Sequence, residues 1–171
     1  MLKFSTQKLA RAGVIGALYV VLSLITFPVA SGAIQFRISE AFTVLPLIFP
    51  EATIGLFVGC VLTGIITGCA IYDVVFGSLI TLVAGMLTFV VGKAIKNKVG
   101  ALILGGVFPV ILNALLLPVI WYFCYGQLEY LYVVQVGFLL ISQSVSVYGI
   151  GSLLYFSVHK LSNAFIDKKS K

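Results

Sequence analysis

The side chains best suited to chemistry in this chain are an arginine and a glutamate close together in the sequence. Arg37 and Glu40 are three positions apart, so on a helix their side chains would be neighbours. A guanidinium group donates hydrogen bonds and a carboxylate accepts them. The two groups can therefore pair and end a helix, or they can bind the polar groups of a small solute. Ionisable groups near membrane depth commonly mark a functional site.

Six further residues could contribute to binding a solute. They are Gln35, Tyr72, Asp73, Asn113, Trp121 and Gln143. Two of them also have ordinary structural explanations. Asp73 stands where the cap of a helix starting at Val74 belongs, and Trp121 could anchor a helix at a membrane interface.

Polar residues on the last apolar stretch lie on one side. Gln135, Ser142 and Ser146 are seven and four positions apart, so they share one side of a helix, with Gln143 beside them. Such a side on a spanning helix faces its neighbours or a cavity. The two prolines of the stretch 99–124 predict backbone carbonyls that are free to accept other hydrogen bonds.

The motifs of common enzyme classes are missing. The chain has no G-x-x-x-x-G-K-[ST] phosphate loop, no H-E-x-x-H and no G-x-S-x-G. One histidine and five acidic residues do not predict a metal centre. The three cysteines, Cys60, Cys69 and Cys124, lack metal-ligand spacing and are expected to pack as small apolar residues. We therefore expect neither an enzyme nor a resident metal or cofactor.

The composition is that of an integral membrane protein. Of the 171 residues, 61% are hydrophobic and 9% are charged, and the mean hydropathy is +1.17. A soluble domain of this size could not bury so much apolar surface. The net charge of +6 does not indicate nucleic-acid binding, because the basic residues are confined to the termini and one loop.

The arrangement of these basic residues predicts six transmembrane helices in one domain, residues 1–171. Long apolar stretches cover residues 9–31, 50–70, 74–92, 99–124 and 131–158, and a shorter one covers residues 34–49. With all six counted, every lysine cluster lies on the cytoplasmic side, as the positive-inside rule expects. Both termini are then cytoplasmic.

The second helix is expected to be short, tilted or entered by a polar segment. Irregular backbone at membrane depth needs cover from protein or a water-filled cavity, so residues 32–40 are a candidate cavity lining. An alternative is that residues 1–31 are a cleaved signal peptide, because small residues follow an apolar run there.

Small residues on the first helix predict a close helix–helix contact. Ala12 and Gly16 are four positions apart, as are Gly13 and Ala17. This stripe can pack inside the chain, or it can dock a separate membrane subunit. Sequence alone leaves both open.

The predicted outer face carries a mildly acidic set of groups. Arg37, Glu40, Asp73 and Glu129 sum to −2 there, against +8 for the rest of the chain. This difference favours neutral or cationic solutes only weakly, because salt screens exposed charges.

One run of residues points to a family. The segment Gln35-Phe36-Arg37-Ile38-Ser39-Glu40-Ala41-Phe42-Thr43-Val44-Leu45-Pro46, followed by Gly55-Leu56-Phe57-Val58-Gly59-Cys60, resembles the QueT family of membrane proteins. That family comprises queuosine-precursor transporters, which are substrate-capture (S) components of energy-coupling factor (ECF) transporters. The resemblance extends over nearly the whole chain.

The resemblance implies a fold, a location and partners. It implies an all-α, six-helix S-component bundle in a bacterial plasma membrane, with a site open to the outside. It also implies the transmembrane coupling subunit EcfT and two ATPase subunits that hydrolyse ATP. The first-helix contact with EcfT would then involve Ala12, Gly13, Gly16 and Ala17.

The implied substrate is a deazaguanine such as queuine or its aminomethyl precursor. A carboxylate can accept the two adjacent N–H donors of a guanine-like edge, so we assign Glu40 to that edge. Arg37 would position this edge or donate a hydrogen bond to the carbonyl group of the solute. Gln35 and Asn113 are alternative donors to that carbonyl group. An aromatic ring, from Trp121, Tyr72 or Tyr122, would stack on the heterocycle. A second acid, such as Asp73 or Glu129, would accept from an amine on the precursor.

Other functions compatible with the sequence are an S component for another vitamin or nucleobase-like solute, and a stand-alone facilitator. A membrane-embedded enzyme is disfavoured by the missing motifs.

Overall fold

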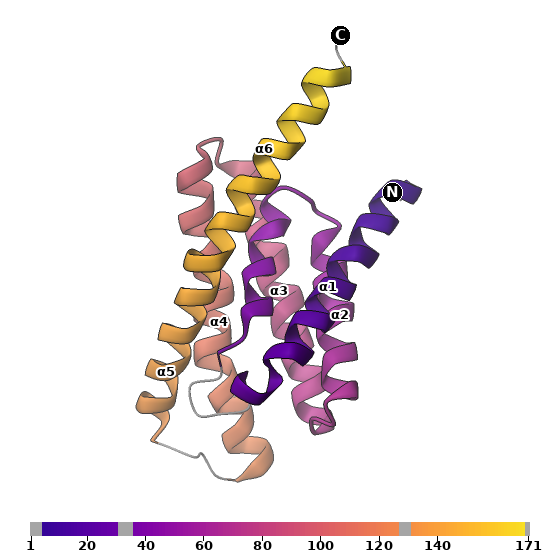
Figure 1. The fold of residues 1–171 in the computed structure, drawn as a ribbon. Coiled ribbons are helices and arrows are strands. Elements are labelled where there is room, and N and C mark those ends of the chain that lie inside the picture. The colour runs from indigo at the N-terminus through magenta and orange to yellow at the C-terminus, as the bar shows by residue number, and fades with distance from the viewer. Residues whose placement is uncertain (1–4, 31–35, 127–130, 170–171) are drawn as a thin grey trace.

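The computed structural model describes residues 5–30, 36–126 and 131–169, and within these ranges every regular element is helical. The elements are α1 (Thr6–Ala30), the 3-10 helix η1 (Ile38–Leu47), α2 (Ala52–Ile66), α3 (Ile71–Ala94), α4 (Lys98–Tyr125), α5 (Tyr132–Ser144), the π-helix η2 (Val145–Ile150) and α6 (Gly151–Lys169). The last three follow one another without a break and form one long rod (Figure 1). The predicted all-α class is confirmed.

The helices differ in their capacity to cross a bilayer. Four segments are long and apolar enough: Thr6–Pro28, Ile71–Ala94, Lys98–Cys124 and Tyr132–Leu161. Two apolar helices, Ile38–Leu47 and Ala52–Ile66, are shorter. Each of these six segments overlaps one of the six predicted spans, and the second is the shortest, as expected.

The short second segment gains length from its helix type. A 3-10 helix rises about 2.0 Å per residue against about 1.5 Å for an α-helix, so the ten residues of η1 extend about 20 Å rather than about 15 Å. Residues 39–46 of η1 are all buried, and the segment lies among the other helices (Figure 1). This enclosure by protein is what permits such backbone at membrane depth.

The basic groups gather at one end of the bundle. The first turn of α1, the far end of α6 and the connection between α3 and α4 all lie there (Figure 1). Lys8 belongs to the start of α1, Lys93 to the last turn of α3, and Lys98 is the first residue of α4. The arrangement matches six crossings, and which side faces the cytoplasm stays a prediction from the positive-inside rule.

The helices α1 and α2 approach each other through glycine. A Cβ atom on Gly16 would lie 2.7 Å from the carbonyl oxygen of Gly55, and one on Gly59 would lie 3.0 Å from that of Gly16. Ala12 is also buried, whereas Gly13 and Ala17 are exposed. Ala12 and Gly16 therefore pack against α2, and of the four predicted docking residues Gly13 and Ala17 are the exposed pair.

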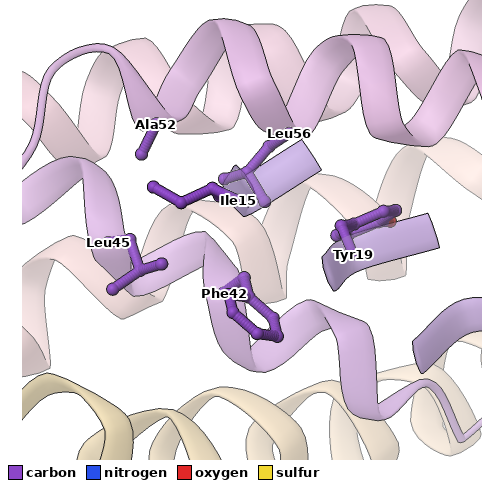
Figure 2. Close-up of a cluster of buried hydrophobic side chains, with 6 residues drawn as sticks. All are labelled: Ile15, Tyr19, Phe42, Leu45, Ala52 and Leu56. Carbon is purple, nitrogen blue, oxygen red and sulfur yellow. The ribbon is translucent and has the colours of Figure 1, made fainter. Parts of the chain in front are cut away.

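The cluster next to this contact joins three elements. It contains Ile15 and Tyr19 from α1, Phe42 and Leu45 from η1, and Ala52 and Leu56 from α2. Figure 2 shows Tyr19 at the end of the cluster away from Ala52. At the basic end, the Arg11 Nε atom lies 3.2 Å from the Glu51 Oε1 atom, and the Arg11 guanidinium lies 4.8 Å from the centre of the Phe49 ring.

Capping and one internal proline shape α4. The Asn97 side chain caps its start by accepting from the Val99 N–H group. Pro109 has no N–H group, so the Gly105 carbonyl lacks its usual helical donor. The Thr88 hydroxyl of α3 donates to this carbonyl at 3.0 Å. The expectation that prolines here free carbonyl groups for other partners is confirmed at this position.

Candidate functional site

A cavity of about 340 Å³ lies at the end of the bundle away from the two termini. Its walls come from the second half of α1, the end of α2, the start of α3 and the second half of α4, with Arg37 between α1 and η1. The volume is within the range of about 300–1,000 Å³ typical of small-molecule sites.

Aromatic and charged side chains face this cavity. Tyr19, Phe27 and Trp121 contribute rings, and Arg37 and Asp73 contribute opposite charges. The indole N–H group of Trp121 donates to the Asp73 Oδ1 atom at 3.0 Å, which ties α3 to α4 at the cavity wall. Such a site can hold a flat solute that carries polar groups on its edge.

Asp73 is not the cap of its helix. Helix α3 begins at Ile71 with Ala70 as its cap, so Asp73 lies inside the first turn. The prediction of a helix starting at Val74 was wrong, because the chain is already helical before the long apolar run. A carboxylate in the first turn still interacts favourably with the positive end of the helix dipole.

Glu40 lies behind the cavity wall and is 2% exposed. Its Oε1 atom accepts from the Tyr19 hydroxyl at 3.0 Å, and its Oε2 atom accepts from the Asn113 amide at 3.4 Å. Glu40 and Asn113 are far apart in sequence, and the structure brings them together at the centre of the bundle.

Arg37 lies just before η1, and Glu40 lies inside it. Arg37 precedes η1 with extended backbone (φ −114°, ψ 106°), and Glu40 lies in the first turn of η1. Arg37 lines the cavity, whereas Glu40 is buried beneath Tyr19. Arg37 therefore stands at the start of the helix and not inside it, but its carbonyl oxygen accepts from the Glu40 N–H group at 3.2 Å and the two side-chain charges interact.

The other residues predicted to bind a solute divide into those that line the cavity and those that do not. Trp121 and Asp73 line the cavity with Arg37. Tyr72 is 50% exposed and is not part of the wall, and Gln143 is buried on α5. Gln35 and Glu129 lie outside the described residues.

The polar side of the last span faces inward as predicted. Gln135, Ser142, Gln143 and Ser146 are each at most 2% exposed. The rod changes from α-helix to π-helix at Val145, beside these residues. π-helical turns often occur at functional sites.

Sequence reasoning missed several residues of the wall. Tyr19 and Ser23 lie four positions apart on α1, and Thr63 and Thr67 lie four apart on α2. That spacing places each pair on one face of its helix. Polar residues repeated at this interval in otherwise apolar helices were the signal that could have found them.

Comparison with known proteins identifies the family. A family model described as QueT transporter matches residues 9–160, a range that includes the cavity wall and the buried contacts of Glu40. No curated protein and no solved structure gives a significant match. With its long apolar helices, the chain is a multi-pass membrane transport protein rather than an enzyme, and it belongs to the QueT transporter family.

Proposed function

We propose that this protein is the substrate-capture component of an ECF importer and that its substrate is a queuosine precursor, either queuine or its aminomethyl-deazaguanine precursor. Membership of the QueT transporter family supports the substrate class. On this proposal EcfT and two ATPase subunits complete the transporter, and ATP is hydrolysed by those subunits. The absence of a phosphate loop from the sequence fits this division of labour.

The observation that carries the proposal is the position and lining of the cavity. It lies at the end of the bundle opposite the basic groups. If the basic end faces the cytoplasm, as the positive-inside rule expects, the cavity faces the outside. A solute could then be captured there before a coupling subunit engages the chain.

The lining suits a deazaguanine. The Trp121 ring can stack on the flat heterocycle, and the Arg37 guanidinium can donate to its carbonyl group. The Asp73 carboxylate can accept from the ammonium group of the aminomethyl precursor. We assign Glu40 to the edge that carries the two adjacent N–H donors.

Thermal stability of the purified chain tests the substrate. A ligand at 100 times its Kd stabilises the folded state by about 2.7 kcal/mol, which raises the Tm of a chain of this size by roughly 5–11 °C. The panel is queuine, the aminomethyl precursor, guanine and common vitamins. A shift with a vitamin alone would make this an S component for another solute.

Protection of a native cysteine tests the location. Cys69 is exposed and lines the cavity, whereas Cys124 does not line it. In variants that each keep one of these two cysteines, bound ligand should slow labelling of Cys69 by a maleimide and leave Cys124 unchanged. Equal protection of both would place the ligand elsewhere. Passage of solute into liposomes that contain this chain alone would instead indicate a facilitator.

A further inference from the structure

The Tyr19 side chain separates the cavity from the buried carboxylate of Glu40. Its ring is part of the cavity wall, and its hydroxyl group donates to the Glu40 Oε1 atom at 3.0 Å. Tyr19 is 1% exposed, and its ring packs 3.2 Å from the position of a Cβ atom on Gly59. A solute in the cavity therefore meets the tyrosine before it can reach Glu40.

Glu40 and Asn113 lie behind Tyr19, and Gln143 lies at a similar level on the adjoining α5–η2 rod. Helix α4 runs antiparallel to the α5–η2 rod (Figure 1), and two clusters set their register: Val110 is grouped with Val147, and Leu117 with Leu139. The same register sets Asn113 of α4 level with Gln143 of α5. Asn113 donates to Glu40, and Gln143 is buried on the neighbouring rod; we call these three residues the inner polar layer.

This layer holds acceptors that the described chain does not fully use. The Gln143 Oε1 atom is buried and has no hydrogen-bond partner among the described residues. The hydroxyl groups of Ser39 on η1 and Ser146 on the adjoining η2 are also buried and also have no hydrogen-bond partner among the described residues. A buried polar group without a partner costs stability, so these groups suit a site that a ligand completes.

We propose that Tyr19 is a gate between the outer cavity and the inner polar layer. Its hydroxyl group occupies the place of a ligand N–H donor on Glu40, and a ligand displaces it to reach Glu40 and Gln143. The identity of that ligand rests on the proposed function: the ring N–H and exocyclic amine of a deazaguanine supply the two donors. The gate itself rests on the geometry alone.

The exchange accounts for the stability of the chain without ligand and for the selectivity of the site. Without ligand, the tyrosine hydroxyl satisfies a carboxylate that would otherwise be buried with an unpaired oxygen atom. A solute that lacks the paired donors would displace the hydroxyl and leave Glu40 unsatisfied, so it binds poorly.

Binding to Tyr19→Phe tests the exchange. The variant keeps the ring and removes the competing hydrogen bond, so it should bind the aminomethyl-deazaguanine about ten times more tightly than the unaltered chain. An analogue without the exocyclic amine should gain little, and Glu40→Gln should lose the preference between the two ligands. Weaker binding of both ligands by Tyr19→Phe would mean that the tyrosine only supports the fold, and would overturn the proposal.

A measurement without ligand tests the gate separately. Ser39→Cys, in a chain whose native cysteines are replaced by alanine, should react slowly with a small charged methanethiosulfonate. Adding Tyr19→Ala should speed this reaction at least ten-fold, whereas Tyr19→Phe should not. If Tyr19→Ala does not fold, Tyr19→Val takes its place. Unchanged labelling overturns the gate; faster labelling in a chain that binds no deazaguanine overturns the proposed substrate and leaves the gate standing.

Discussion

Alanine at Gly13 and at Gly16 should change the stability of this chain in opposite directions. Both glycines lie within α1, and they are three positions apart. A Cβ atom at Gly16 would lie 2.7 Å from the Gly55 carbonyl oxygen, which belongs to the backbone of α2 and cannot rotate away. A Cβ atom at Gly13 would have no atom of the described structure within 4 Å outside its own helix.

The magnitudes follow from two competing terms. Alanine stabilises a helix relative to glycine by about 0.5–1 kcal/mol, and this is the whole effect expected at Gly13. At Gly16 the two helices must also separate, and forcing extra atoms into a packed contact costs about 1–3 kcal/mol. Gly16→Ala should therefore lose about 1.3 kcal/mol in the middle of the two ranges and at most about 2.5 kcal/mol, which lowers the Tm by up to roughly 10 °C.

The assay is thermal unfolding in detergent, followed by far-UV circular dichroism. Gly137→Ala on α5 is the matched control, because a Cβ atom there also meets nothing within 4 Å in the described structure. It should behave like Gly13→Ala. A Gly16→Ala variant that melts at or above the temperature of Gly13→Ala would refute the close approach of α1 and α2.

Three further predictions concern the exposed face of α1, the hydrogen bond between α3 and α4, and the aromatic wall of the cavity. Under the proposed function, Gly13→Leu should keep ligand binding and lose co-purification with EcfT, because Gly13 is on the exposed face of α1; a retained complex would exclude that face as the docking surface. Thr88→Val should lower the free energy of unfolding by about 1–3 kcal/mol, because it leaves a buried carbonyl of α4 unpaired; adding Pro109→Ala, which restores a helical N–H donor, should recover part of the loss in the same denaturation assay. Trp121→Phe keeps an aromatic ring and removes the hydrogen bond to Asp73, so calorimetry should show a smaller loss of ligand affinity than for Trp121→Ala; equal losses would argue against stacking.

Some parts of the site could be predicted because they depend on local features. Trp121, Asp73 and Arg37 are polar or amphipathic residues in apolar surroundings, and all three line the cavity. The inward side of the last span followed from the spacing of Gln135 and Ser142. Neither inference required knowledge of which helices are neighbours.

Other parts could not be predicted because they depend on contacts between distant segments. The bond from Asn113 to Glu40 joins residues 73 positions apart. The role of Tyr19 was missed for the same reason, since a tyrosine in an apolar helix has no local signal for the carboxylate it contacts. Gly13 and Gly16 have the same residue type and similar neighbours, and only the position of α2 distinguishes them.

From residue types alone it could be predicted that this chain is a membrane protein, that it has six apolar segments and that its basic groups lie on one side of the membrane. These properties come from the transfer of side chains between water and lipid, which acts residue by residue. The tertiary structure alone decided that η1 is stretched and enclosed, that Tyr19 covers Glu40 and that the cavity forms from four helices and Arg37. Those properties arise from packing and hydrogen bonding between segments, and in lipid it is these interactions, more than hydrophobicity, that select which helix faces meet.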